Sequence, residues 1–431
     1  MKNITRAIRE ERLSNGIHLI VDPFGASGVV SLACSFAGGK LMAGAPLVAE
    51  MTSSMLAEGT KRRSKREIQR LLDSLGLERE YGALGRRMEV LGKARTVHAE
   101  ELFKLIAEEL REPAFGKNEF DSLIRRAKGA LQHEQQDTRL RAHIGLSRLL
   151  YAAGHPNREL SIEERFSALA QLQLKDVRAQ ARLIGTQGMT VVLSGNMPFA
   201  RARALVRKYF GTLPPGAPLP ELAPEAPRIE AEQALIPVPY KSSIDYVVGV
   251  RTGLTKQHRD FNALAMGLRI LGNPGGFSGR LMQTVREKEG LTYGVYSYLK
   301  GFDELCDGHA LLWGTFAPEL FERGRSGVLR ELRRIVEKGV SKNELQEHVH
   351  MLADGAYVRL SNTEARAQTL LATAHDGRPP SYLDEYLEEA RALTVREVNA
   401  ALKTYLPLQK LSEAAAGPVA GVSLRPYNRR T

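Results

Sequence analysis

Residues 275–297 read GGFSGRLMQTVREKEGLTYGVYS, and this stretch is the most informative part of the sequence. Its leading glycines predict a tight turn, Ser278 is a residue type that caps helices, and Gly290 can end the helix in the left-handed conformation. A strand rich in aromatic and branched residues is predicted to follow. Arg286 is then expected in the last helical turn and Tyr293 in the strand, so the turn at Gly290 can bring guanidinium and phenol together.

These two side chains also have ordinary structural roles open to them. Arg286 can interact favourably with the negative end of the helix dipole, and Tyr293 can fill the core. The residues taken alone do not decide between those roles and ligand binding.

The stretch lies in the second of two similar halves. Eight prolines within residues 214–239 exclude a helix or a central strand there and predict a linker. Strand-like runs open each half, at 17–21 and 29–36 in the first and at 244–250 in the second. We therefore predict an internal duplication in an α+β fold, with two related domains that each carry a mostly antiparallel sheet covered by several helices. The predicted boundaries are 1–213, 214–239 for the linker, and 240–431.

Apolar residues at three- and four-residue spacing predict long amphipathic helices in both halves. In the first half they cover about 46–58, 65–75, 99–110, 117–137 and 140–152, before a closing strand at 189–195 and a helix at 199–210. In the second half they cover about 259–271, 317–338, 341–357, 362–374 and 394–404.

Composition excludes several classes of protein. Of the 431 residues 43% are apolar, and no apolar run approaches a membrane span. Only Cys34 and Cys306 are present, which argues against a disulfide framework or a thiolate zinc knot. The net charge of +12 comes from basic residues scattered among acidic ones, which indicates solvated helix faces rather than a nucleic-acid surface. As written the chain is expected to be cytoplasmic, or periplasmic if a signal peptide was removed before numbering began.

The stretch 275–297 resembles the C-terminal signature of the pitrilysin, insulinase and mitochondrial-processing-peptidase family, the inverted zincins. The glycine turn, the Arg-Glu-Lys run at 286–288 and the run GLTYG at 290–294 carry the resemblance. In that family an Arg and a Tyr seven residues later bind the main chain of the substrate, and Arg286 and Tyr293 match this spacing. The resemblance implies two peptidase-like domains, of which the second carries the substrate-binding pair.

Members that cleave peptides carry His-x-x-Glu-His, then Gly-Thr, and a Glu much farther along. Residues 59–60 supply the Gly-Thr pair. Counting back places Glu50 and Ser54 at the histidine positions and Ser53 at the general-base position, and the distant glutamate falls near Ala130. A catalytic zinc needs about three strong protein ligands, and only Glu50 could serve. The resemblance therefore implies a degenerate metal site, with no metal, no catalytic residue and no zinc endopeptidase activity in this chain alone.

No other motif replaces the missing site. None of the ten histidines forms His-x-x-Glu-His or its reverse. His348 and His350 would point about 200° apart on a helix, so they cannot chelate one ion, and we expect both to be exposed. His133 is also expected at the surface. Ser53 and Ser54 have no recognisable partner histidine, and no Gly-x-Ser-x-Gly elbow occurs.

Some bacterial members of the family divide the work between two chains, and one chain lacks the zinc motif yet keeps the Arg and Tyr. The resemblance therefore implies a non-catalytic, substrate-binding subunit of a heteromeric zinc metallopeptidase, a heterodimer or larger assembly with zinc in a paralogous partner. Peptides are the implied ligands, and nucleic acid and membrane are not. Residues 79–83 match only weakly the substrate-binding edge strand of active members. A self-sufficient peptide-binding or scaffold protein, as a homodimer, is the alternative, and a peptidase with another metal site is a third reading.

Overall fold

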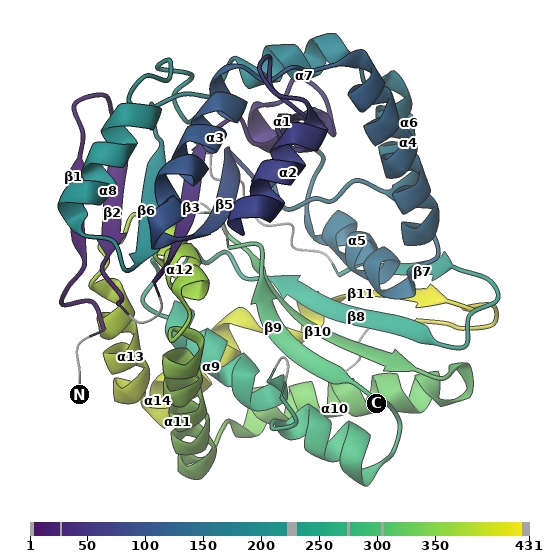
Figure 1. Cartoon of the computed structure of the whole chain (residues 1–431). Coiled ribbons are helices and arrows are strands. Elements are labelled where there is room, and N and C mark those ends of the chain that lie inside the picture. The colour runs from purple at the N-terminus through teal and green to yellow at the C-terminus, as the bar shows by residue number, and fades with distance from the viewer. Residues whose placement is uncertain (1–3, 26–27, 222–230, 274–275, 303–305, 425–431) are drawn as a thin grey trace. The chain divides into compact units, whose positions relative to one another are not determined.

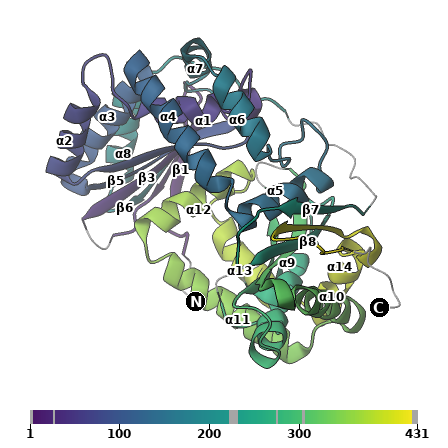
Figure 2. The same cartoon turned by 90° about the vertical axis from the view of Figure 1, so that its right-hand side faces the viewer.

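The computed structural model describes residues 4–25, 28–221, 231–273, 276–302 and 306–424. It divides into two compact units, each built around one mixed sheet (Figures 1 and 2). Unit 1 takes its described residues from Met1–Gly129, Arg165–Glu221 and Gly355–Glu385, and unit 2 takes the remainder. The predicted α+β class is confirmed.

Unit 1 contains a six-stranded sheet with the order β1-β2-β6-β3-β5-β4. The strands are β1 (Arg9–Arg12), β2 (His18–Asp22), β3 (Val29–Ala37), β4 (Glu78–Ala83), β5 (Arg87–Arg95) and β6 (Thr190–Gly195). Only β2 and β6 pair in parallel. β3 lies inside the sheet, where Cys34 faces Val90 on one side and Val191 on the other. β4 is an edge strand.

Unit 2 contains a five-stranded sheet with the order β7-β11-β8-β10-β9. The strands are β7 (Gln233–Pro237), β8 (Ile244–Arg251), β9 (Val295–Lys300), β10 (His309–Phe316) and β11 (Ser412–Gly417). Again only one pair, β7 with β11, is parallel. When β1 is left aside, each sheet has five strands. If these are numbered by their order in the sequence, both sheets have the same spatial order, 1-5-2-4-3. This shared topology is what an internal duplication predicts.

The helices follow the predicted amphipathic spacing closely. In unit 1 they include α1 (Val48–Leu56), α2 (Lys65–Leu75), α3 (Ala99–Arg111), α7 (Leu174–Ala181), and α8 (Phe199–Leu205) with its π-helical extension η3 (Val206–Phe210). α4 (Lys117–Glu134) ends in unit 2, and α6 (Ile162–Gln171) begins there. In unit 2 they include α9 (Phe261–Gly272), the π-helical turn η4 (Met282–Lys288), α10 (Phe321–Lys338) and α14 (Val395–Tyr405). Two further helices cross the division: α11 (Lys342–Arg359) ends in unit 1, and α13 (Tyr382–Ala392) begins there. The sequence did not predict α6, α7 or α13. Across the part of the chain that is described, no helix is long and apolar enough to cross a membrane.

The predicted linker is partly structured. β7 lies within it and ends at Pro237, and β7 is an edge strand, where a missing backbone donor costs least. Residues 222–230 lie outside the described residues, as does Gly275 of the predicted turn.

Two helices are exchanged between the sequence halves. α5 (Thr138–Leu150), from the first half, packs on β8 and β11 of unit 2, and α12 (Thr363–His375), from the second half, packs on β3 and β6 of unit 1 (Figures 1 and 2). Gly145 allows the close approach of α5, because a Cβ there would lie 2.5 Å from Ile236. The compact units therefore do not coincide with continuous halves of the sequence. The domain boundaries at residues 213 and 240 remain a prediction of where the two duplicated halves end and begin.

A buried polar seam fixes α12 on its sheet. The Arg366 guanidinium donates to both carboxylate oxygens of Asp22 at 2.5 and 2.9 Å, and Ser194 donates to the same carboxylate at 2.8 Å. Ser31 and Thr363 hydroxyls lie 2.8 Å apart. Apolar contacts flank the seam, with Ile20, Ala33 and Val192 of the sheet facing Ala367, Leu370 and Leu371. The ion pair is well satisfied, which is the condition under which a buried pair is tolerated.

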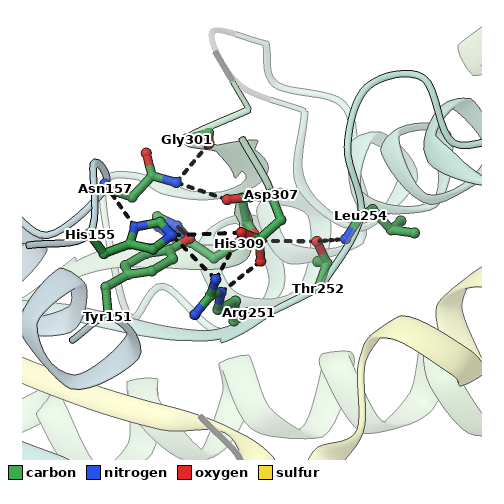
Figure 3. A network of polar contacts seen from close by, with 10 residues as sticks. Tyr151, His155, Asn157, Arg251, Thr252, Leu254, Gly301, Asp307 and His309 are labelled. Carbon is green, nitrogen blue, oxygen red and sulfur yellow. Dashed lines mark hydrogen bonds and ion pairs between the residues drawn. The ribbon is translucent and has the colours of Figure 1, made fainter. Parts of the chain in front are cut away.

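A second polar network follows α5 in unit 2 (Figure 3). Arg251, at the end of β8, donates to Asp307 at 2.6 and 2.9 Å, and its Nη2 lies 3.2 Å from His155 Nε2. The Tyr151 hydroxyl lies 3.0 Å from Nδ1 of His309. The network ties the segment after α5 to the ends of β8 and β10.

Arg366→Leu should lower the free energy of unfolding by about 3 to 5 kcal/mol, because it leaves the Asp22 carboxylate buried without its cation. Urea unfolding followed by circular dichroism measures this loss. Arg396→Leu, at an exposed site on α14, is the control and should change stability by about 0.5 kcal/mol or less. Equal stability of the two variants would contradict the role given to the seam.

Stability should fall as the pH drops below 6.5, in part because of His309. Burial lowers the pKa of His309 to about 3, and the charges of Lys300 and His143 act in the same direction. Between the two pKa values the unfolded chain binds a proton that the folded chain does not, so acid favours unfolding, by about 2 kcal/mol at pH 5 from this residue. His309→Gln should flatten the pH dependence between pH 7 and pH 5 in thermal unfolding. An unchanged slope would show that His309 does not carry it.

Candidate functional site

The degenerate metal positions lie on α1, which keeps a packed inner face. Val48, Met51, Met55 and Leu56 are buried, whereas Glu50 is partly exposed and its carboxylate lies 3.3 Å from the Lys40 ammonium. The helix therefore packs by residues other than the one that could bind a metal.

The serine hydroxyls on α1 are used within the helix. Ser53 and Ser54 donate to the Glu50 carbonyl at 2.8 and 3.0 Å. Such bonds to the preceding turn are ordinary for serine in a helix. A hydroxyl held in this way is neither a zinc ligand nor an efficient base for a water molecule.

The position of the distant glutamate offers no ligand either. Ala130 lies on α4, exposed, with only a methyl group. Over the described ranges no group of three or more His, Cys, Asp or Glu side chains is placed to hold a metal ion. The donor set at Glu50, Ser53, Ser54 and Ala130 does not fit a catalytic zinc, which needs about three strong ligands.

The predicted counterpart of the substrate-binding edge strand is β4. Arg79 and Tyr81 do not point outward along it: the guanidinium lies 2.7 Å from Glu109 on α3, and the phenol donates to the same carboxylate at 2.7 Å. Glu109 is fully buried, and burial raises its pKa while the two partners oppose that shift. These side chains anchor α3 to the sheet.

Arg286 and Tyr293 lie together in unit 2. The Arg286 guanidinium carbon lies over the Tyr293 ring, 5.3 Å from its centroid, and also over the Phe277 ring at 4.7 Å. Tyr293 is 82% exposed and Phe277 is 63% exposed. We call these three side chains the Arg286 clamp.

The local sequence explains this arrangement. Arg286 belongs to η4, and Gly290 ends that turn with φ +64°, the left-handed value expected from the sequence. The Leu291 amide donates to the Val285 carbonyl at 3.0 Å, which turns the chain back beside the helix. Val285 is buried and fixes the inner face of η4.

The expected place of Tyr293 in a strand is wrong. β9 begins at Val295, and Tyr293 lies in a bend before it. The cause is Thr292, whose hydroxyl donates to the Thr315 carbonyl and accepts from the Gly294 amide at 3.1 Å. These bonds replace strand pairing and leave the Tyr293 ring in solvent.

Phe277 is the member that sequence reasoning missed. A usable signal was present, because this large apolar residue stands between Gly276, Ser278 and Gly279, none of which can shield it. Ser278 itself accepts a hydrogen bond from the Asn273 amide at 3.0 Å.

The clamp can bind hydrogen-bond acceptors. The Arg286 side chain has no hydrogen-bond or ion-pair partner among the described residues, so its donors are available to a ligand. A guanidinium that lies over aromatic rings keeps its N–H groups directed outward in its own plane. The exposed Tyr293 hydroxyl adds another donor. This set suits the carbonyl oxygens of an extended peptide.

One of the two histidines on α11 differs from expectation. His350 is exposed, but His348 is only 4% exposed, which makes the prediction of its exposure wrong. His348 shares the buried face of the helix with Leu345 and Val349. Burial lowers its pKa, and the Arg269 charge adds to that shift. His133 is exposed as predicted.

Comparison with known proteins gives a consistent result. Residues 180–352 match the family model described as the peptidase M16 inactive domain. The chain is 22% identical to the non-peptidase homolog YmxG of Helicobacter pylori over 85% of this chain and 83% of that protein. It is 29% identical to an uncharacterized zinc protease of Mycobacterium tuberculosis over 53% of this chain and 52% of that one.

Solved structures share the fold. The peptidase M16 inactive domain from Pseudomonas fluorescens superposes with a TM-score of 0.88 at 24% identity, covering 98% of this chain and 100% of that chain. The periplasmic protease PqqL from Escherichia coli gives a TM-score of 0.77 at 20% identity, covering 97% of this chain but 46% of that one.

Purified chain incubated with zinc and then desalted should retain substoichiometric metal by mass spectrometry, because Glu50 supplies one ligand where about three are needed. Glu50→Ala should leave the zinc content unchanged. If the unmodified chain retained one zinc and Glu50→Ala lost it, α1 would carry a metal site, which would contradict this prediction.

Proposed function

Because this chain belongs to the peptidase M16 family as an inactive-type member, we propose that it is the non-catalytic, substrate-binding subunit of a heteromeric zinc metallopeptidase. Its role is to hold an extended peptide while a zinc-bearing paralogous partner cleaves it. The observation that carries the proposal is the Arg286 clamp: guanidinium donors that have no polar partner among the described residues lie beside two exposed rings, in a chain whose metal positions hold Glu50, Ser53, Ser54 and Ala130.

The chain cannot supply the chemical step by itself. Peptide hydrolysis by a zinc peptidase needs an activated water and a base close to the metal. Ser53 and Ser54 offer hydroxyls already bonded to the Glu50 carbonyl, and Ala130 offers no donor. The partner must therefore bring the zinc, the water and the base.

The clamp supplies positioning. Arg286 and Tyr293 donate to carbonyl oxygens of the peptide main chain, so recognition is largely independent of the side-chain sequence. Fixing the peptide beside the metal turns an encounter into an oriented reaction. A donor aimed at the scissile carbonyl also stabilises the negative charge that develops on its oxygen.

Arg286→Ala should lower cleavage by the complex about a hundredfold, which corresponds to ~3 kcal/mol for one such donor. The assay uses this chain mixed with a zinc-bearing paralogue from the same genome and a quenched fluorescent peptide. Lys288→Ala, an exposed change two residues along the same helix, is the matched control and should cleave as the unmodified complex does.

Three results would contradict the proposal. Hydrolysis by this chain alone would assign it its own active site. Unchanged turnover with Arg286→Ala would remove the clamp from the mechanism. Peptide binding by this chain, without faster cleavage by any zinc-bearing paralogue, would favour a self-sufficient peptide-binding or scaffold protein.

A further inference from the structure

Phe277 is a large apolar side chain that remains 63% exposed and lies beside the Arg286 guanidinium. We propose that Phe277 is a positioning and selectivity residue of the clamp: it orients the Arg286 guanidinium and presents its remaining surface to an apolar side chain of the bound peptide. This inference rests on the proposed function and names the class of peptide that the clamp prefers.

The first step is orientation. Arginine has a long flexible side chain, and its ordering before a ligand arrives reduces the entropy lost on binding. In the described structure Arg286 makes ring contacts but no polar side-chain contact, and the Phe277 contact, at 4.7 Å, is the shorter of the two. Phe277 therefore contributes directly to holding the guanidinium in place.

The second step is the exposed part of the ring. Gly276, Ser278 and Gly279 surround Phe277 in sequence and are too small to cover it. Exposed aromatic rings next to an arginine are the composition of binding hot spots, where a partner excludes water from both groups. A peptide whose carbonyl meets Arg286 brings a neighbouring side chain close to this ring.

The third step concerns the polarity and charge of the peptide side chain that meets the Phe277 ring. Leucine, methionine or an aromatic residue gains from burial against the ring. Serine gains little. Lysine is disfavoured, because its ammonium would approach the Arg286 cation. The clamp should therefore prefer peptides with a large apolar residue at this position.

The test measures binding of short fluorescein-labelled peptides to the full chain by fluorescence anisotropy. The peptides are rich in alanine and differ only in a central Leu, Ser or Lys. Unmodified protein should bind the Leu peptide about tenfold more tightly than the Ser peptide, as expected for partial burial of one leucine. The Lys peptide should bind most weakly.

Phe277→Ala should abolish the preference for leucine over serine and weaken binding of the Ser peptide by about two- to fivefold, through loss of the ring contact to Arg286. Phe277→Tyr keeps the ring and should restore both properties. Neither variant should shift thermal unfolding, since the side chain is largely exposed. Lys288→Ala should bind all three peptides as the unmodified chain does.

The outcomes separate this inference from the proposed function. If Arg286→Ala loses binding while Phe277→Ala keeps both affinity and leucine preference, the inference fails and the proposed function stands. Equal losses in Phe277→Tyr and Phe277→Ala would also defeat it. If Arg286→Ala binds like the unmodified chain, or that chain binds none of the peptides, the proposed function fails and the inference falls with it.

Discussion

In each unit, one face of the sheet is buried by a helix that comes from the other half of the sequence. Ile20, Ala33 and Val192 would face water without α12, and the face of the second sheet that includes Val247 and Leu311 would face water without α5. Apolar area of this kind supplies most of the folding free energy of a domain. The Arg366–Asp22 pair then sets where α12 lies on that face, because two buried charges must meet.

The same packing explains how chemistry can be absent where the fold is kept. On α1 the buried positions include Met51 and Met55, which are apolar, while Glu50 and Ser54 lie toward solvent. Substitution at such outer positions leaves no cavity in the core. The same holds for the Arg286 clamp. The buried Val285 packs η4 against the rest of unit 2, and the neighbouring Arg286 extends from that helix.

Much of the fold follows from local patterns in the sequence. Long helices such as α3 and α10 repeat an apolar stripe over several turns, and strands β3 and β8 are short, mostly apolar runs, so the local pattern reveals them. α6 and α7 are short, with ten and eight residues, and give few repeats to recognise. The helix exchange is a contact between distant segments, and no local pattern records it.

In the candidate site, too, the sequence predicts the features that depend on a local pattern and misses those that depend on distant contacts. Gly290 revealed the turn that brings Arg286 to Tyr293, because a left-handed residue after a helix is a local property. The bend at Tyr293 depends on the Thr315 carbonyl of a neighbouring strand, which spacing cannot show. His348 was misjudged because its burial depends on what packs against α11 rather than on its own polarity.

The exchanged helix α12 also has a consequence for synthesis of the protein. Strands β1 to β6 end at residue 195, yet the helix that covers them spans Thr363–His375. The ribosome therefore completes the strands of the first sheet before the helix that covers them is made, and the nascent chain carries an open apolar surface while residues 196–362 are translated. Exposed apolar surfaces of this kind promote aggregation and are what chaperones bind.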